Sequence, residues 1–518
     1  MGDDTGHIVL REVILSREIN SYLMIRKIPH SAYFFMTLLF ITGCSLVGIN
    51  FNAESPKKPK KYPKFTVRDS LRGKISPERS VYDVHYYDLN LDIDVKKKFL
   101  HGYVDFYFTA MSEFSRLQID LFENMDINGI QYNGSEVPYE RKYDAVFLNF
   151  NEKVRKGDRG MFRVHYSGKP MVAKKPPWEG GFVWEKDRKG NPWIGVACEG
   201  DGASLWWPVK DHLYDEPDSV LMNVTVPREL KVVSNGRLRT VDEKDGRATY
   251  RWFTSNPINS YNVTLYAGDF RKITMKYPKE DVTHELEFWV LPENLDKAKT
   301  HFKQTIDIIA FFESAFGEYP WWEDGFKMVE SPYAGMEHQT AIAYGSGYSN
   351  GGYSGHDFDY IILHETAHEW WGNSVSARDM ADLWIHEGFA TYAEALYVEH
   401  TEGKKAYEQY VYIHSMFIKN HHPMVGPRDV NYFNYKDSDP YMKGSLMLHS
   451  LRFTMDNDTL FKDIIKTFAI ENRKKVVESQ DFIDLVNRKT GEDYTWFFNQ
   501  FLHNYKSPRL EYTYDYDD

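Results

Sequence analysis

Asp357–Gly372 read DFDYIILHETAHEWWG, and this stretch carries the strongest structural signal in the chain. Its apolar residues fall on one helical face and Gly372 is a stop signal, so the pattern predicts a helix. His364 and His368 lie four positions apart. A helix of about 3.6 residues per turn projects them from one side, one turn apart. Two imidazoles in that arrangement can bind one tetrahedral zinc ion.

A catalytic zinc site needs a third protein ligand and an open position for water. Glu387 is the candidate, because it lies in a second helical pattern, LWIHEGFATY over 383–392, that could return beside the first. Glu365 follows a ligand and cannot easily bind the same ion, so it is the candidate base that takes a proton from water at the metal. The alternative for the two histidines is a buried, hydrogen-bonded pair.

Composition argues against two kinds of site. The 518 residues carry a net charge of −12, whereas nucleic-acid-binding proteins present a basic face, so no nucleic-acid partner is expected. Cys44 and Cys198 are the only cysteines in the sequence. A disulfide framework and a cysteine-rich zinc site are therefore excluded.

Residues 1–43 read as a pre-sequence and a lipoprotein-type signal peptide. A basic stretch begins at Met24 and precedes an apolar run over 32–41, which is too short to cross a bilayer. The run ends in small residues at Cys44, as in bacterial lipoproteins whose cysteine is lipidated. A plain secretory signal and a chance apolar patch are the alternatives. We expect export and a membrane anchor at Cys44, in the periplasm or on the cell surface.

Residues 44–80 are rich in lysine and proline. That composition favours an extended linker that does not pack, and its expected role is a tether.

From Val81 the apolar pattern has a period of two. Leu89, Leu91 and Ile93 alternate with polar residues, which is typical of a half-buried strand. Turn signals recur between such runs, for example at Asn133-Gly134 and Asp245-Gly246. Many short strands with regular turns predict a β-saddle or β-sandwich domain over 81–275.

The period lengthens to that of helices from about Leu295, and a helix is expected to end near Gly317. The second domain is therefore predicted to be mainly α-helical and the fold class α+β. Residues 509–514 read as a strand, and we expect 506–518 to be the start of a further, truncated β-domain.

Three elements resemble the zinc aminopeptidases related to aminopeptidase N and leukotriene hydrolase. Eighteen residues (369–386) separate the HExxH element from Glu387, as in that family. Ala334–His338 (AGMEH) is similar to its G-x-M-E-N element, and Pro440–Gly444 (PYMKG) to its P-Y-x-K-G element. The match runs in order over about 81–505. It implies a thermolysin-like catalytic domain over 276–505 with one zinc ion per chain.

The resemblance also implies roles for further residues. Glu337 and Glu199 would bind the free α-amino group of a peptide substrate, since a fixed carboxylate is neutralised by an ammonium. Tyr441 would donate a hydrogen bond to the oxyanion at the scissile carbonyl. Backbone groups at Gly335 and Met336 would hold the peptide extended. The implied activity is release of the N-terminal residue from peptides.

The chain departs from the family pattern at three positions. His338 replaces the usual Asn of the G-x-M-E-N element, and His386 stands where Asn often precedes the third ligand. Ala197 sits where many relatives have Gln. These changes leave the selectivity for the first side chain open.

Three other activities remain possible from the sequence. A thermolysin-like endopeptidase would share the zinc site, although the Glu337 element argues against it. One branch of the family has an epoxide hydrolase activity, which nothing specific supports here. The third is a non-catalytic lipoprotein that binds peptides on the same scaffold. The oligomeric state and the preferred side chain are not encoded in any recognisable motif.

Overall fold

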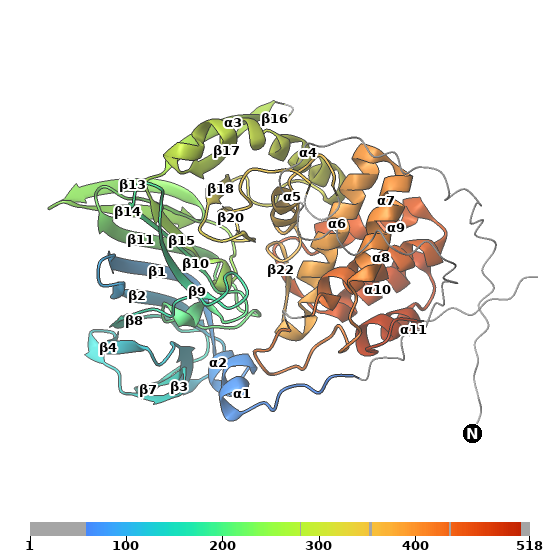
Figure 1. Ribbon diagram of the computed structural model, residues 1–518. Coiled ribbons are helices and arrows are strands. Elements are labelled where there is room, and N and C mark those ends of the chain that lie inside the picture. Colours follow the sequence, from blue (N-terminus) through green and yellow to red (C-terminus); the bar gives the residue numbers. More distant parts are fainter. Residues whose placement is uncertain (1–58, 280, 352–354, 435–436, 509–518) are drawn as a thin grey trace, which may run out of the picture. The chain divides into compact units, whose positions relative to one another are not determined.

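The computed structural model describes residues 59–279, 281–351, 355–434 and 437–508. A β-rich region comes first and a helical region follows (Figure 1), which confirms the α+β prediction. The predicted signal peptide, Cys44 and residues 509–518 lie outside the described ranges. None of the helices within those ranges combines the length and the apolar character needed to span a bilayer.

The largest sheet of the described residues is mainly antiparallel. Its central strand, β1, pairs antiparallel with β2 and parallel with β11. Leu89, Leu91 and Ile93 of β1 are all buried, so the predicted alternation is confirmed. In sheet order the strands are β13 (Arg237–Lys244), β14 (Arg247–Thr254), β11 (Ser219–Pro227), β1 (Tyr82–Asp94), β2 (Phe99–Ala110), β8 (Arg159–Gly168), β4 (Met125–Tyr132) and β5 (Ser135–Glu136).

Two of the predicted turns close hairpins in this sheet. Asn133 and Gly134, between β4 and β5, have φ of 49° and 78°. Asp245 and Gly246, between β13 and β14, have φ of 50° and 75°. Two successive residues with positive φ match the twist of the flanking strands, and Asn-Gly and Asp-Gly tolerate that conformation best.

Smaller sheets complete the β-rich region. One consists of β3 (Phe114–Asp120), β7 (Ala145–Val154) and β6 (Tyr139–Lys142), and another of β12 (Lys231–Ser234), β15 (Leu265–Gly268), β10 (Pro192–Ala197) and β9 (Gly181–Lys186). A mixed sheet leads into the helical region, in the order β16 (Arg271–Lys279), β17 (Val282–Val290), β18 (Phe326–Glu330), β20 (Ile342–Tyr344) and β19 (Gly335–Met336). The predicted domain boundary after residue 275 falls within β16.

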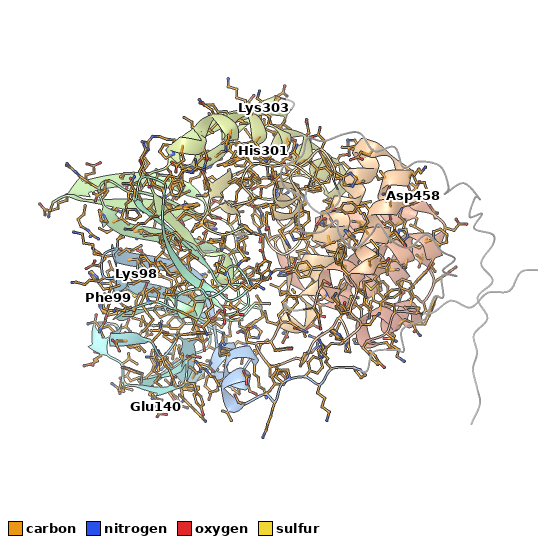
Figure 2. All side chains as sticks on the ribbon, viewed as in Figure 1. Lys98, Phe99, Glu140, His301, Lys303 and Asp458 are labelled. Carbon is orange, nitrogen blue, oxygen red and sulfur yellow. The ribbon has the colours of Figure 1, made fainter. Side chains whose placement is uncertain are left out.

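The helical region packs around α6 and α8. A Cβ atom added to Gly444 of α8 would lie 2.7 Å from the Cα atom of Gly388 in α6, so the two backbones touch there. Side chains fill the space between the ribbons (Figure 2). The elements are α3 (Leu295–His301), α4 (Gln304–Phe316), α5 (Tyr360–Ala367), α6 (Trp384–Glu402), α7 (Lys404–Met416), α8 (Asp439–Met455), α9 (Asp458–Glu471), α10 (Ser479–Thr490), α11 (Thr495–Phe498) and the paired strands β21 (Val375–Ala377) and β22 (Lys475–Val477).

The helix with the two histidines is shorter than predicted. Asp359 caps its start by accepting a hydrogen bond from the backbone N–H of Ile361. The helix ends at Ala367, with His368 as its C-cap, instead of continuing to Gly372. Gly372 has a φ of 113° and donates its N–H to the carbonyl of Val375, so it belongs to the following turn.

The prediction that residues 44–80 stay extended and unpacked is wrong for the part from Val67. Residues 67–73 form α1 (Val67–Gly73) and residues 77–80 form α2 (Pro77–Ser80). Thr66 and Asp69 form a capping box at α1, and Ser76 and Pro77 begin α2. These are local start signals that the overall lysine and proline content concealed.

Candidate metal centre and peptide-binding site

His364, His368 and Glu387 converge at one buried point. The Nε2 atoms of the two histidines are 3.1 Å apart. Oε2 of Glu387 lies 3.5 Å from Nε2 of His364 and 3.4 Å from Nε2 of His368. The predicted ligands therefore come together because α5 and α6 lie side by side: His364 lies in α5, His368 is its C-cap, and Glu387 lies in α6.

These distances fit a zinc ion. Ligands at about 2.0–2.1 Å from a tetrahedral metal are separated from one another by about 3.3 Å. Oε2 of Glu387 is buried and has no hydrogen-bond partner within the described part of the chain. A buried carboxylate oxygen without a partner is costly, and a cation bound by the three side chains removes that cost.

Contacts behind the ligands orient the two imidazoles. Nδ1 of His364 lies 2.6 Å from Oε1 of Glu394, and Nδ1 of His368 lies 2.8 Å from the carbonyl oxygen of Trp371. Both partners can only accept, so the protons sit on the Nδ1 atoms and the Nε2 lone pairs face Glu387. Glu394, which also accepts from the hydroxyl of Tyr410 at 2.5 Å, was missed by the sequence reasoning. Its signal is the seven-residue spacing from Glu387, which places both on one face of α6.

Glu365 lies beside the ligands and faces β19. A Cβ atom added to Gly335 would lie 2.5 Å from Oε1 of Glu365, so a larger residue there would displace the carboxylate from its present position. Carboxylate oxygens of Glu365 and Glu337 and a ring nitrogen of His368 lie within 4.8 Å of one another. Burial raises the pKa of Glu365 to about 8, and a cation at the ligands would lower it again.

Beside the metal ligands, Glu337 and Glu199 form a buried acidic pair. They come from separate regions, Glu337 following β19 and Glu199 following β10. Their carboxylates and a ring nitrogen of His386 lie within 4.8 Å of one another. Burial, followed by the charge of Glu337, raises the pKa of Glu199 well above its usual range. Two carboxylates buried together favour a cationic ligand between them.

Tyr261, from the β-rich region, supports Glu337 and was also missed. Its hydroxyl donates to Oε1 of Glu337 at 3.2 Å and lies 3.5 Å from Nδ1 of His386. Nε2 of His386 accepts the backbone N–H of Ala377 at 2.8 Å, so the ring proton is on Nδ1 and points at Tyr261. His386, which differs from the family pattern, thus contributes to the contacts that hold Tyr261 and Glu337 in place. No local sequence pattern could indicate Tyr261, because it lies far from the other residues along the chain.

The remaining predicted residues surround the same point. The ring of Tyr441, in the first turn of α8, stacks against His364 with centroids 6.3 Å apart. Gly335 and Met336 form β19, which pairs with β20 on one side and is an edge of its sheet as described. An edge strand offers backbone groups to an extended peptide.

The other two departures lie in supporting positions. His338 is buried, and its Nδ1 lies 2.7 Å from the hydroxyl of Tyr266. Burial lowers the pKa of His338 to about 3, so the ring is neutral. Ala197 is buried at the end of β10.

Comparison with known proteins finds a matching peptidase domain and related aminopeptidases. Residues 300–501 match the family described as "Peptidase family M1 domain". Leucyl aminopeptidase of Saccharolobus solfataricus is 25% identical over 274 residues, which are 50% of this chain and 32% of that protein. Human aminopeptidase B is 26% identical over 263 residues, which are 47% of this chain and 38% of that protein. The chain thus spans about a third of the length of these curated relatives.

Solved structures share the fold. An M1 zinc metallopeptidase variant of Deinococcus radiodurans, bound to a Tyr-Ser-Ala substrate, superposes with a TM-score of 0.71 at 23% identity, and the alignment covers 85% of this chain and 99% of that one. Yeast LTA4 hydrolase superposes with a TM-score of 0.70 at 18% identity, covering 90% of this chain and 73% of that one. The two-region architecture is therefore an established fold.

Proposed function

We propose that this chain, whose residues 300–501 are a peptidase family M1 domain, is a zinc aminopeptidase that releases the N-terminal residue from peptides. The observation that carries the proposal is the pair of adjoining sites. A three-ligand metal centre lies beside a buried acidic pair, so a carbonyl at the metal and an ammonium at the carboxylates can belong to the same terminal residue.

The metal supplies one part of the chemistry. His364, His368 and Glu387 would hold a zinc ion, which when bound would supply Lewis acidity and lower the pKa of water at the site towards neutrality. Glu394 and the carbonyl of Trp371 keep the two imidazoles in the tautomer that can bind it.

The remaining steps belong to the side chains around the metal. Glu337 and Glu199 hold the substrate ammonium, and the edge of β19 holds the peptide backbone. Glu365 takes a proton from the attacking water and delivers it to the leaving amine. Tyr441 donates a hydrogen bond to the oxyanion that develops on the scissile carbonyl. The terminal residue and the shortened peptide are then released.

The test is release of a fluorophore from a panel of aminoacyl substrates, compared with the same substrates blocked at the amine. The zinc-loaded protein should cleave only the free-amine forms. Glu337→Ala should lower turnover of these substrates by about 10²-fold or more while the zinc content stays at one per chain. Equal rates on blocked peptides would instead identify an endopeptidase, and binding without turnover would identify a peptide-binding protein.

A lipid anchor at Cys44 is the second part of the proposal. It is supported by the order of basic, apolar and small residues before that cysteine and places the enzyme outside the cytoplasm on a membrane. Mass spectrometry of the membrane fraction should find a mature N-terminus at a lipidated Cys44. A mature N-terminus elsewhere, or a Cys44→Ser variant that remains in the membrane fraction, would exclude the anchor.

A further inference from the structure

The loop that carries Glu199 depends on contacts from outside itself. Oε1 of Glu199 is buried without a hydrogen-bond partner among the described residues, so the loop backbone has to hold the carboxylate in place. Two carbonyls directly after Glu199 accept side-chain hydrogen bonds. The carbonyl of Gly200 accepts from Nδ2 of Asn431 at 3.0 Å, and that of Asp201 accepts from Arg72 of α1.

The last turn of α1 contacts both this loop and residues 430–431. A Cβ atom added to Gly73 would lie 2.1 Å from the carbonyl carbon of Val430, so the two backbones are in contact. A small cavity joins the three segments, lined among others by Arg72, Gly73, Glu199 and Asn431. The end of α1 therefore lines the same cavity as Glu199.

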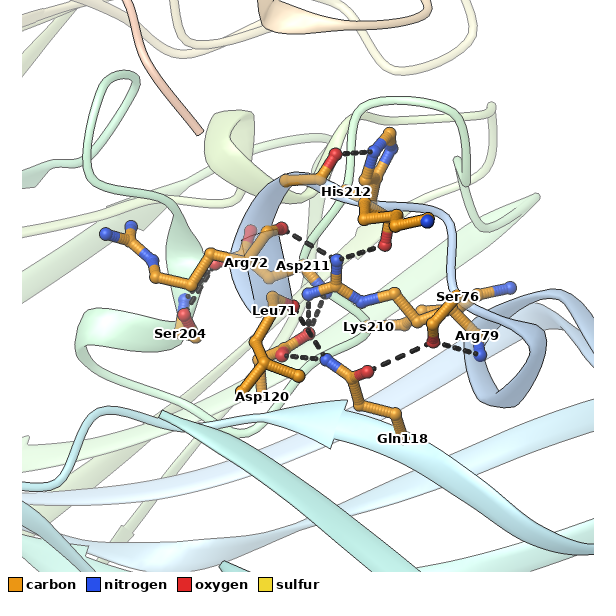
Figure 3. A network of polar contacts seen from close by, with 12 residues as sticks. Leu71, Arg72, Ser76, Arg79, Gln118, Asp120, Ser204, Lys210, Asp211 and His212 are labelled. Atoms are coloured by element: carbon orange, nitrogen blue, oxygen red, sulfur yellow. Dashed lines mark hydrogen bonds and ion pairs between the residues drawn. The ribbon is translucent and has the colours of Figure 1, made fainter. Parts of the chain in front are cut away.

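A buried network fixes the end of α1 (Figure 3). Arg79 forms an ion pair with Asp120 at 2.7 Å, and both side chains are almost fully buried. The same guanidinium donates to the carbonyl of Arg72 at 2.7 Å. Nε2 of His212 lies 3.1 Å from the carbonyl of Gly73. The ion pair and these two hydrogen bonds hold the backbone of Arg72 and Gly73 in place.

We infer that Arg72 is a positioning residue for amine recognition. Its contact from α1 fixes the backbone of the loop of residues 199–202, and that backbone fixes the position of the Glu199 carboxylate. The inference rests on the proposed function, because it concerns the same ammonium-binding pair. Arg72 itself does not touch the substrate. Its guanidinium packs over the ring of Phe122, with 4.8 Å to the centroid, which keeps it aimed at the loop.

The experiment measures binding of a free-amine tripeptide and of its N-acetylated form by calorimetry. The full-length, zinc-loaded protein carries Glu365→Gln to prevent turnover. Adding Arg72→Ala should lower the affinity for the free-amine peptide by about tenfold, which corresponds to the loss of one hydrogen bond from a charged group. The acetylated peptide should be affected less than about twofold, since it has no ammonium for Glu199. Arg72→Lys, which keeps a donor, should recover part of the affinity.

Arg68→Ala is the matched control. Arg68 lies on the same helix and pairs with Asp144 at 2.8 Å, away from the loop. It should change the affinity for either peptide less than about twofold. Melting temperatures of all variants separate a folding defect from a binding defect.

A background without Glu199 decides between positioning and general support. In the Glu199→Ala background, adding Arg72→Ala should lower the affinity for the free-amine peptide no further, because the effects of substitutions at coupled residues are not additive. A full tenfold loss in that background overturns the inference, and so does an Arg72→Ala affinity equal to that of Arg68→Ala. Failure of the wild-type protein to cleave any free-amine substrate overturns the proposed function separately, since the binding measurement needs no turnover.

Discussion

Glu365 is the residue on which turnover depends in the proposed mechanism. In that mechanism His364 and His368 would hold the metal, while Gly335 leaves the space that the carboxylate of Glu365 occupies. The separate roles of the two histidines and of Glu365 follow from helix geometry, because only positions one turn apart project from the same side. Glu365 therefore points to a different part of the site from the ligands.

The first prediction tests these separate roles. Glu365→Gln keeps the size of the side chain but cannot accept a proton, so kcat should fall by about 10²–10⁴-fold. Zinc content, measured by atomic emission, should stay at one per chain because Glu365 is not a ligand. Turnover within about tenfold of the wild type would show that another group is the base.

The second prediction concerns Tyr261. Tyr261→Phe removes the hydroxyl that donates to Glu337 at 3.2 Å, so KM for free-amine substrates should rise by about fivefold to tenfold. Steady-state kinetics should show a smaller change in kcat, because Tyr261 lies behind the acidic pair. Tyr266→Phe is the control, since Tyr266 bonds His338 and the carbonyl of Ala341 instead. Equal effects of the two variants would remove the positioning role of Tyr261.

At the scale of elements, α6 and α8 decide how the metal site and the oxyanion site face each other. The third ligand is on α6 and Tyr441 is on α8. Their backbones touch at Gly388 and Gly444, because glycine at both positions leaves no side chain between the helices. The spacing between Glu387 and Tyr441 therefore depends on this contact.

The third prediction is that Gly444→Val separates the two helices. The added side chain meets backbone at 2.7 Å, so unfolding free energy should drop by about 1–3 kcal/mol, and kcat should fall with it. Denaturant titration and kinetics measure both. Phe453→Ala is the control on the same helix, because Phe453 is 53% exposed and should change stability by about 0.5 kcal/mol or less. A Gly444→Val protein of unchanged stability would contradict the close contact.

At the scale of the whole molecule, buried histidines tie stability to pH. Burial, aided by the charge of Arg79, lowers the pKa of His212 to about 3. In the unfolded chain a histidine has a pKa of about 6.5. Below a pH of about 6.5, His212 binds a proton in the unfolded state but not in the folded state, so the free energy of unfolding falls as the pH drops towards about 3.

The fourth prediction follows from that difference. His212 should contribute a loss of about 1.36 kcal/mol per pH unit below pH 6. His212→Gln, which remains neutral, should therefore show a flatter decline between pH 6 and pH 4.5, measured by urea unfolding of the zinc-free protein. The two proteins should have parallel profiles above pH 7.5. Identical slopes at low pH would show that His212 is protonated in the folded state.

The local features of the fold follow from the amino-acid sequence alone. Strand alternation in β1, the Asn-Gly and Asp-Gly turns and the spacing of His364 and His368 follow from periods of a few residues. The α+β class was predicted in this way and is confirmed. The length of α5 and the helices at 67–80 were predicted wrongly, because caps and tertiary contacts override composition.

Contacts between segments that are distant in the sequence become visible only in the folded chain. The fold brings the hydroxyl of Tyr261 to Glu337 and the carboxylate of Glu394 to Nδ1 of His364. It also brings Arg72 of α1 to the loop that carries Glu199. Such contacts have no fixed sequence spacing, since loops of any length can bring two segments together at little additional entropic cost. The stretch around His364 and His368 therefore predicts the metal site, while the packing of the β-rich region against the helices determines where the carboxylates proposed to bind a substrate amine lie.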